Sequence, residues 1–464
     1  MSDFAQELFA RTVAEPYRTK VVERIRLPDR AARAQILERA FYSPVMVDAS
    51  DVYVDLITDS GSGAMSTQQW SGIMRGDESY IRSKSFFEFE QAVREVTGYR
   101  CAVPTHQGRA AEHILSELFV GPDQIVLANA HFDTTKANIE NRGASAVDLV
   151  SDTLWKFREE EPFKGNFDLE KLQVALERYH ERVPMIIITV LNNLACSAPV
   201  SMNNIIEVRR LADKYRIPVF FDAARFAENA YFIKTREQGF ESRTVADIAR
   251  EMLSYGHGCW MSAKKDALVN IGGFIATNDE ALARRCQQKV VLYEGFYTYG
   301  GLARRDLEAI AIGLREGLED DYLAHRTRLV AFLGDRIEQA GAVVSKPVGG
   351  SGVFVDVESI YPHLSADKLP GIALFCDLYL EGGIRAGASP FEMRTIDPKT
   401  GELISRLFQF ARFAVPRRVY SRSHMEYVGH VVERVKQVAH MSRGYRIVEY
   451  PNVLGHFFSK FAPL

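Results

Sequence analysis

From about residue 100 onward, short runs of β-branched and aromatic residues alternate with amphipathic stretches. A short apolar run bounded by turn residues predicts a buried strand, whereas apolar residues three and four positions apart predict a helix. Between the third and fourth runs, Ile205, Val208 and Ala212 recur at helical spacing, and Tyr215 continues the series. The five strand-like runs are QIVLAN (124–129), SAVDLV (145–150), PMIIITV (184–190), IPVFFDAAR (217–225) and GGFIAT (272–277).

This strand, helix, strand order predicts a right-handed crossover and therefore a parallel sheet. After about residue 310 longer helical patterns follow, in residues 307–341, and then a strand-like run in residues 349–357. The pattern predicts an α/β protein with a large, mainly parallel-sheet domain and a smaller α+β domain. We expect an N-terminal arm and part of the small domain in residues 1–57, the large domain in 58–312 and the small domain in 313–464.

Composition narrows the possible functions. With 464 residues, 47% hydrophobic and 25% charged, the chain can build two cores, and its net charge of −3 predicts no nucleic-acid partner. Residues 1–20 lack an apolar signal core and no run is long enough to span a bilayer, so we expect a cytoplasmic protein with no membrane partner. The cysteines are scattered, odd in number and without a CxxC pair, which indicates reduced packing residues. They are Cys101, Cys196, Cys259, Cys286 and Cys376.

Two adjacent lysines, Lys264 and Lys265, stand in the otherwise apolar and small-residue run WMSAKKDALVNIGGF (260–274). Most such pairs lie in solvent-exposed loops, and that is the simpler interpretation. The alternative is that one lysine forms a Schiff base with pyridoxal phosphate while its like-charged neighbour helps to lower its pKa.

Two further features fit a pyridoxal phosphate site. Asp222 ends a predicted strand 43 residues before Lys265, and Arg225 follows it, so they could serve the pyridine nitrogen and the phenolic oxygen. Gln107, Gly108 and Arg109 precede a helical stretch, and helix N-termini bind phosphate. Each feature alone also has a structural interpretation, Asp222 as a helix cap and residues 107–109 as a glycine turn.

The order of these pieces resembles the β-eliminating lyases of the tryptophanase and tyrosine phenol-lyase group, which have the aspartate aminotransferase-like fold type I. The resemblance runs from about residue 15 to the C-terminus and implies a pyridoxal 5'-phosphate enzyme. It is carried by the strings LITDSGSGAMS, MRGDESY, PTHQGR, KGNFDLE, DAARFAENAYFIK, MSAKKDA, TYGGL, DPKTGE and VPRRVYSRSHM.

The resemblance assigns the cofactor residues one by one. Lys265 matches the Schiff-base lysine, Phe132 the ring that stacks on the pyridine, and Asn193 a residue near the phenolic oxygen. Asp222 and Arg225 match the partners of the pyridine nitrogen and the phenolic oxygen. The phosphate ligands would be Gln107, Gly108, Arg109, Ser262 and Lys264.

The substrate, cation and assembly expectations also follow from the resemblance. Arg412 would pair with the substrate carboxylate, with Thr58 nearby, because a guanidinium fork can bind both oxygens. Gly61, Glu78 and Asn270 match ligands of a potassium-like cation at a subunit interface. Together with the segment EPYRTKVVERIRL (15–27), these ligands predict a homotetramer built from dimers that share active sites.

Cleaving a carbon–carbon bond to an aromatic ring requires an acid on the leaving-group side, and Tyr80 matches the family's tyrosine there. Asp133, His456 and Ser389 occupy positions that separate the two branches, and all three indicate indole as the leaving group. Either Asp133 or His456 could instead be structural, Asp133 as a cap of the following helix. The resemblance thus predicts a β-elimination that converts L-tryptophan to indole, pyruvate and ammonia.

Some positions depart from both branches. AGGQPVS of the family reads ACSAPVS here, which places Cys196, Ser197 and Ala198 in a loop beside Asn193. Val45 and Tyr297 replace an apparent phenylalanine and a proline, and AGASPFEMRT (386–395) matches neither branch well. The leaving group could therefore differ, as in tyrosine or an S-alkylcysteine. An aminotransferase and a non-catalytic paralogue are the alternatives from other classes.

Overall fold

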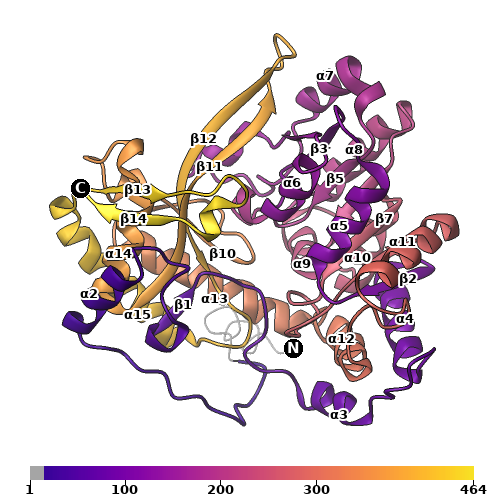
Figure 1. The fold of residues 1–464 in the computed structure, drawn as a ribbon, viewed down its shortest axis with the longest axis horizontal. Helices are drawn as coiled ribbons and strands as arrows, with labels where there is room; N and C mark the ends of the chain where they lie inside the picture. Colours follow the sequence, from indigo (N-terminus) through magenta and orange to yellow (C-terminus); the bar gives the residue numbers. More distant parts are fainter. Residues whose placement is uncertain (1–14) are drawn as a thin grey trace.

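The computed structural model of the chain describes residues 15–464, except for the side chains of residues 388–391 and 407. Its largest sheet has seven strands in the order β2-β8-β7-β6-β5-β3-β4 (Figure 1). These strands are β2 (Cys101–Thr105), β3 (Ile125–Ala128), β4 (Ser145–Asp148), β5 (Ile186–Thr189), β6 (Val219–Asp222), β7 (Gly258–Ser262) and β8 (Gly273–Thr277).

Five neighbouring strands of this sheet, β4-β3-β5-β6-β7, run parallel, as the sequence pattern predicts. The strand β8 instead pairs antiparallel with both β7 and β2. The run GGFIAT is therefore a strand, but it does not continue the parallel series. β7 and β8 are joined by the short connection that contains the lysine pair, and a connection of that length suits an antiparallel pair.

The helices of this part bury apolar faces against the sheet. In α8 (Met202–Lys214) the predicted face is buried through Ile205, Val208 and Ala212, and Ser201 caps the first turn by accepting a hydrogen bond from Asn204 N. The other helices around the large sheet are α3 (Thr67–Arg75), α4 (Lys84–Thr97), α5 (Gly108–Phe119), α6 (Asp133–Glu140), α7 (Leu169–Tyr179), α9 (Phe226–Arg236), α10 (Val245–Ser254), α11 (Glu280–Tyr293) and α12 (Arg304–Glu316).

A second, five-stranded sheet has the order β1-β11-β12-β10-β9 and packs with helices of the C-terminal part (Figure 1). The N-terminal segment contributes β1, which pairs parallel with β11. The elements are α2 (Arg30–Arg39), β1 (Val54–Leu56), α13 (Asp320–Gln339), β9 (Val343–Val344), β10 (Gly352–Asp356), α14 (Pro370–Gly382), β11 (Ile384–Ile396), β12 (Leu403–Ala414) and α15 (Arg422–Val438). A two-stranded sheet follows, of β13 (Tyr445–Glu449) and β14 (Lys460–Pro463).

The long helical pattern of residues 307–341 forms two helices, α12 and α13, which are separated after Glu316. At Gly317 a Cβ atom would lie 2.0 Å from the carbonyl oxygen of Asp266. Only glycine allows this close approach, so the break brings the chain against the segment that follows the lysine pair. The domain boundaries at 57/58 and 312/313 remain predictions, and the second lies within α12.

Along residues 15–464, no helix is both long enough and apolar enough to cross a membrane. The five cysteines are free thiols, and four of them are buried, which agrees with their predicted role as reduced packing residues.

A buried group of charges connects the two sheets, and Arg417, which follows β12, is at its centre. The Arg417 side chain is fully buried; one amino group binds Glu228 (2.7 Å) and Asp266 (2.9 Å), and the other binds Asp59 (3.1 Å). Arg326 of α13 donates to Glu228 as well, at 3.1 Å. Burial of an ion is costly unless opposite charges surround it, so these residues depend on one another for their stability.

Replacing Arg417 by methionine should therefore lower the free energy of unfolding by about 3–5 kcal/mol, because buried Asp266 loses its cation and buried Asp59 and Glu228 each lose one of two. Arg30→Met is the matched control. Arg30 pairs with Glu381 at 2.9 Å, but its side chain is 63% exposed, so its loss should cost no more than about 1 kcal/mol. Urea unfolding followed by circular dichroism measures both. Equal losses in the two variants would contradict the structural role of the buried charges.

Candidate active site

The predicted phosphate loop lies at the N-terminus of α5 and directly against the end of β7. At Gly108 a Cβ atom would lie 2.6 Å from the Cβ of Ser262, so a side chain cannot be accommodated there. Gln107 precedes the helix and makes no side-chain capping hydrogen bond. Unpaired backbone N–H groups, the Ser262 hydroxyl and the nearby positive charges of Arg109 and Lys264 together form a cradle that suits a phosphate.

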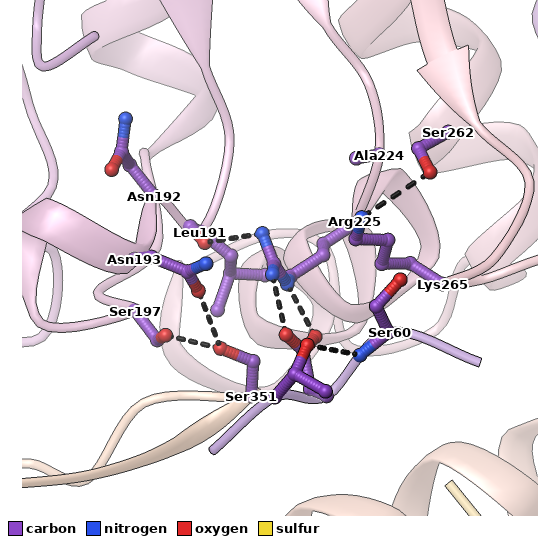
Figure 2. A network of polar contacts seen from close by, with 12 residues as sticks. Ser60, Leu191, Asn192, Asn193, Ser197, Ala224, Arg225, Ser262, Lys265 and Ser351 are labelled. Carbon is purple, nitrogen blue, oxygen red and sulfur yellow. Dashed lines mark hydrogen bonds and ion pairs between the residues drawn. The ribbon is translucent and has the colours of Figure 1, made fainter. Parts of the chain in front are cut away.

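Lys265 is the more deeply placed member of the lysine pair, and its Nζ donates a hydrogen bond to Ser262 Oγ at 3.2 Å (Figure 2). Burial lowers the pKa of Lys265 to about 8, helped next by the positive charge of Arg225 and then more weakly by Lys264. The like-charged neighbour thus contributes as expected, but it is not the main cause. A primary amine with this pKa is partly unprotonated near neutral pH and can act as a nucleophile and a base.

Asp222, at the end of β6, is a buried carboxylate. Burial raises its pKa, although the charges of Arg225 and Lys265 act in the opposite direction. Its Oδ1 accepts a hydrogen bond from Ala224 N at 3.2 Å, and no cation of residues 15–464 lies within hydrogen-bonding distance of it. A protonated pyridine nitrogen would supply the missing positive charge, so this position fits pyridoxal phosphate.

Arg225 is held in place by a residue that the sequence patterns did not single out. Its guanidinium makes a bidentate ion pair with Asp59, at 2.7 and 2.8 Å. A longer hydrogen bond joins it to the carbonyl oxygen of Leu191 (Figure 2). Asp59 stands in the string LITDSG, which resembles the family, and this string was the signal in the sequence that could have indicated a role for Asp59. Asn193 lies on the same side of Arg225 as Leu191 (Figure 2). Its Oδ1 accepts a hydrogen bond from the Ser351 hydroxyl at 3.5 Å.

The two predicted substrate-carboxylate residues are brought together from distant segments. Arg412, on β12, donates to the carbonyl oxygen of Ile57 at 2.8 Å, directly before Thr58. Thr58 is exposed, and its hydroxyl accepts a hydrogen bond from Ser60 N at 3.0 Å. Burial lowers the pKa of Arg412, with Asp59 opposing and Arg225 adding to the shift. The guanidinium is therefore poorly compensated and suited to an incoming carboxylate.

Asp133 and His456 are in contact although 323 residues separate them. His456 Nε2 lies 3.3 Å from Asp133 Oδ2, and both side chains are partly exposed. Phe132 directly precedes α6 and Asp133 is its first residue, where Asp133 Oδ1 also accepts a hydrogen bond from Thr134 N. Asp133 is therefore not the cap of this helix, because Phe132 occupies the N-cap position and Asp133 lies within the first turn. Its carboxylate contacts both the Thr134 N–H and His456.

Tyr80 and Glu78 contact residues 296–305 rather than the residues around Lys265. Tyr80 is 59% exposed and packs on the rings of Phe296 and Tyr299, away from the contacts of Lys265. The Glu78 carboxylate accepts hydrogen bonds from the backbone N–H groups of Arg304 and Arg305 at the start of α12. A single chain therefore does not bring Tyr80 to the lysine.

Of the three predicted cation ligands, Gly61 and Asn270 are neighbours. Asn270 Oδ1 accepts a hydrogen bond from Ser62 N at 2.9 Å, and Gly61 N donates to the carbonyl oxygen of Lys264 at 2.6 Å. Within residues 15–464 no group of three or more His, Cys, Asp or Glu side chains could hold a metal ion. A cation site built from Gly61 and Asn270 would thus depend on carbonyl and amide oxygens.

The loop that departs from the family lies against Asn193. Cys196 and Ser197 have positive φ angles of 52° and 49°, which glycine adopts more easily. Ser197 Oγ and Ser351 Oγ form a short hydrogen bond, and Ser351 reaches Asn193, so the substitutions replace glycine freedom by side-chain contacts. Ala198 is buried in the same loop.

Three other positions that bear on the leaving group are less informative. Val45 is 39% exposed. The Tyr297 ring packs on Phe296 at 4.6 Å between centroids. Ser389 lies on β11, and its side chain is outside the part that the structure describes.

Comparison with known proteins identifies the family. Residues 55–430 match the family model described as β-eliminating lyase. A tryptophanase of Salinibacter ruber is 46% identical over 97% of this chain and 96% of its own length. A tyrosine phenol-lyase of Symbiobacterium sp. is 42% identical over 97% and 99%.

Solved structures with low sequence identity share the fold. A serine palmitoyltransferase of Sphingomonas wittichii superposes with a TM-score of 0.56 at 15% identity, covering 94% of this chain and 96% of that one. A SepCysS chain from a complex with a SepCysE N-terminal domain gives a TM-score of 0.54 at 14% identity, covering 83% and 95%. The expected fold type I is confirmed. The chain belongs to the β-eliminating lyase family and is a pyridoxal phosphate-dependent lyase.

Proposed function

We propose that this enzyme cleaves the Cβ–Cγ bond of L-tryptophan and releases indole, pyruvate and ammonia. The contact between Asp133 and His456 carries the proposal, because it joins the two residues that the resemblance places at the indole edge. The identity to a tryptophanase, 46%, supports the same choice.

Bound pyridoxal phosphate supplies an electron sink that stabilises the negative charge left on the substrate Cα. In this assignment the phosphate is held by Gln107, Gly108, Arg109, Ser262 and Lys264. Phe132 would cover the ring, Asp222 would pair with the pyridine nitrogen, and Arg225 and Asn193 would face the phenolic oxygen. The ion pair with Asp59 then fixes the direction in which Arg225 donates.

The substrate carboxylate pairs with Arg412, and Thr58 donates its hydroxyl to the same group. Lys265 removes the proton from the substrate Cα, and its pKa of about 8 leaves enough free amine for this step. Its burial also keeps water away from the proton that it carries.

Expulsion of the aromatic ring requires a proton at the ring carbon bonded to Cβ. Tyr80 of a second copy would deliver that proton, since its own chain leaves it exposed. Asp133 accepts the indole N–H, and His456 keeps the carboxylate oriented. The aminoacrylate released afterwards hydrolyses to pyruvate and ammonia.

A second candidate is the elimination of another side chain. The 42% identity to a tyrosine phenol-lyase and the altered loop of Cys196, Ser197 and Ala198 favour this alternative. A thiolate leaves without ring protonation, so S-alkylcysteines are the simplest further substrates. A pyruvate-release screen of tryptophan, tyrosine, cysteine and S-alkylcysteines distinguishes these cases.

The assembly and ion proposals belong with this function. We infer a cytoplasmic homotetramer, a dimer of dimers, in which Gly61 and Asn270 of one chain and Glu78 of another bind potassium. The extended segment of residues 15–27 supports the assembly, since Val21 and Val22 are 87% and 84% exposed in the single chain.

Lys265→Ala should remove both the visible absorbance of the lysine-linked cofactor and pyruvate release, because no other amine occupies that position. Lys264→Ala should weaken cofactor affinity but retain the absorbance, since this assignment gives Lys264 only the phosphate. Absorption spectroscopy of the purified variants gives the answer. If Lys264→Ala loses the band and Lys265→Ala keeps it, the two roles are reversed.

Asp133→Ala and His456→Phe should each reduce indole release from tryptophan by about 10² or more, because proton transfer at the ring loses its support. Release of pyruvate from an S-alkylcysteine should change little. Coupled pyruvate assays on both substrates provide the measurement. Equal losses would assign the pair to folding or closure.

Shared active sites should be visible by subunit mixing. Lys265→Ala and Tyr80→Phe should each be inactive alone, whereas co-assembled mixtures should regain activity in about a quarter of the sites, where one chain supplies the lysine and the other the tyrosine. Light scattering should report a tetramer. An active monomer, or mixtures that stay inactive, would refute the arrangement.

A further inference from the structure

The carboxyl group of Glu112 lies inside the site and has no role in the steps above. Glu112 is on α5, one turn after Gly108, and is 6% exposed. Its Oε2 accepts a hydrogen bond from the Thr134 hydroxyl at 2.6 Å. The backbone N–H of Thr134 donates to Asp133 Oδ1 at 2.7 Å, and Asp133 Oδ2 reaches His456. Glu112 is therefore connected to the leaving-group pair through one residue.

Glu112 also interacts electrostatically with the partner of the pyridine nitrogen. The charged groups that act on it are Asp222 at the end of β6, Asp133 on α6 and Lys265 after β7. Two of these three are carboxylates. Glu112 and Asp222 are both buried, and Asp133 adds a third carboxyl group nearby. Ionising all three beside Lys265 would carry a large cost in free energy, so one of them must hold a proton.

The environment decides which carboxyl holds the proton. Burial, and next the negative charge of Asp222, raise the pKa of Glu112 to about 8. Asp133 is partly exposed and in contact with His456, so it is less deeply buried than Glu112. Asp222 must remain ionised to pair with a protonated pyridine nitrogen.

We propose that Glu112 is a positioning residue that remains a neutral carboxylic acid, leaves the negative charge to Asp222 and holds Asp133 towards His456 through Thr134. This inference rests on the proposed function only for the leaving-group role of Asp133. The protonation state of Glu112 is independent of which substrate is cleaved.

The protonation state can be tested by thermal unfolding of the full-length holoenzyme between pH 5.5 and pH 8.5. The folded pKa is above the unfolded value of about 4.3, so the stability from this proton is lost as the pH rises towards about 8. Glu112→Gln keeps the hydrogen-bond acceptor but carries no such proton. The unfolding midpoint of the variant minus that of the wild type should therefore rise by about 2 °C or more from pH 5.5 to pH 8.5.

Glu117, on the same helix, offers the matched control. Its carboxylate accepts hydrogen bonds from Lys289 (2.6 Å) and Tyr293, and these bonds lower its pKa. Glu117→Gln should therefore give a difference that stays flat between pH 5.5 and pH 8.5, because Glu117 is ionised throughout. A flat difference for Glu112→Gln as well would overturn the proposal.

Kinetics test the connection through Thr134. Glu112→Gln should keep pyruvate release within about threefold of wild type, whereas Thr134→Val should reduce release from tryptophan about tenfold or more and spare an S-alkylcysteine. Thr134→Ser keeps the hydroxyl and should therefore cleave tryptophan at close to the wild-type rate. Loss of both activities in Glu112→Gln, or equal effects of Thr134→Val on the two substrates, would overturn it. A wild-type enzyme inert towards tryptophan would reject the proposed substrate, and the unfolding series would still decide the state of Glu112.

Discussion

The ion pairs of Arg417 are the constraint on which the rest of the structure depends. One buried guanidinium holds carboxylates from three segments: Asp59 beyond β1, Glu228 on α9 and Asp266 after the lysine pair. Because a buried charge is tolerated only while its partners stay in place, these segments are held together. Asp59 in turn orients Arg225, and Asp266 adjoins Lys265, so the cofactor side of the site inherits its geometry from this group.

The charges nearest the cofactor follow a simple pattern. Burial raises the pKa of Asp222 and of Glu112 and lowers that of Lys265, so each group is driven towards its neutral form. A ligand with a positive pyridine nitrogen would favour the charged form of Asp222, and its negative phosphate would offset the nearby positive charges. The site is thus electrostatically incomplete in the chain alone and complementary to pyridoxal phosphate.

The residues that we propose to act on the leaving group come from more distant segments than those assigned to the cofactor. The cofactor groups lie at strand ends and adjoining helix starts of one sheet, as in other α/β proteins. Asp133 meets His456 from near the C-terminus, and Tyr80 stands exposed on the surface of its own chain. Substitutions in one of these segments can therefore occur without altering the residues around Lys265.

The sequence alone determined the features with a local cause. Apolar runs located the strands β3, β4, β5 and β6, and helical spacing located α8. Long motif strings indicated the family and predicted roles for Lys265, Asp222 and the phosphate loop. Tertiary structure decided the antiparallel direction of β8, the separation of α12 from α13 at Gly317 and the contact of Asp133 with His456. It also made burial, rather than Lys264, the main cause of the low pKa of Lys265, and it revealed Arg417 and Glu112. These features depend on distances between residues far apart in the chain and on exclusion of water, which a local pattern of residue types does not encode.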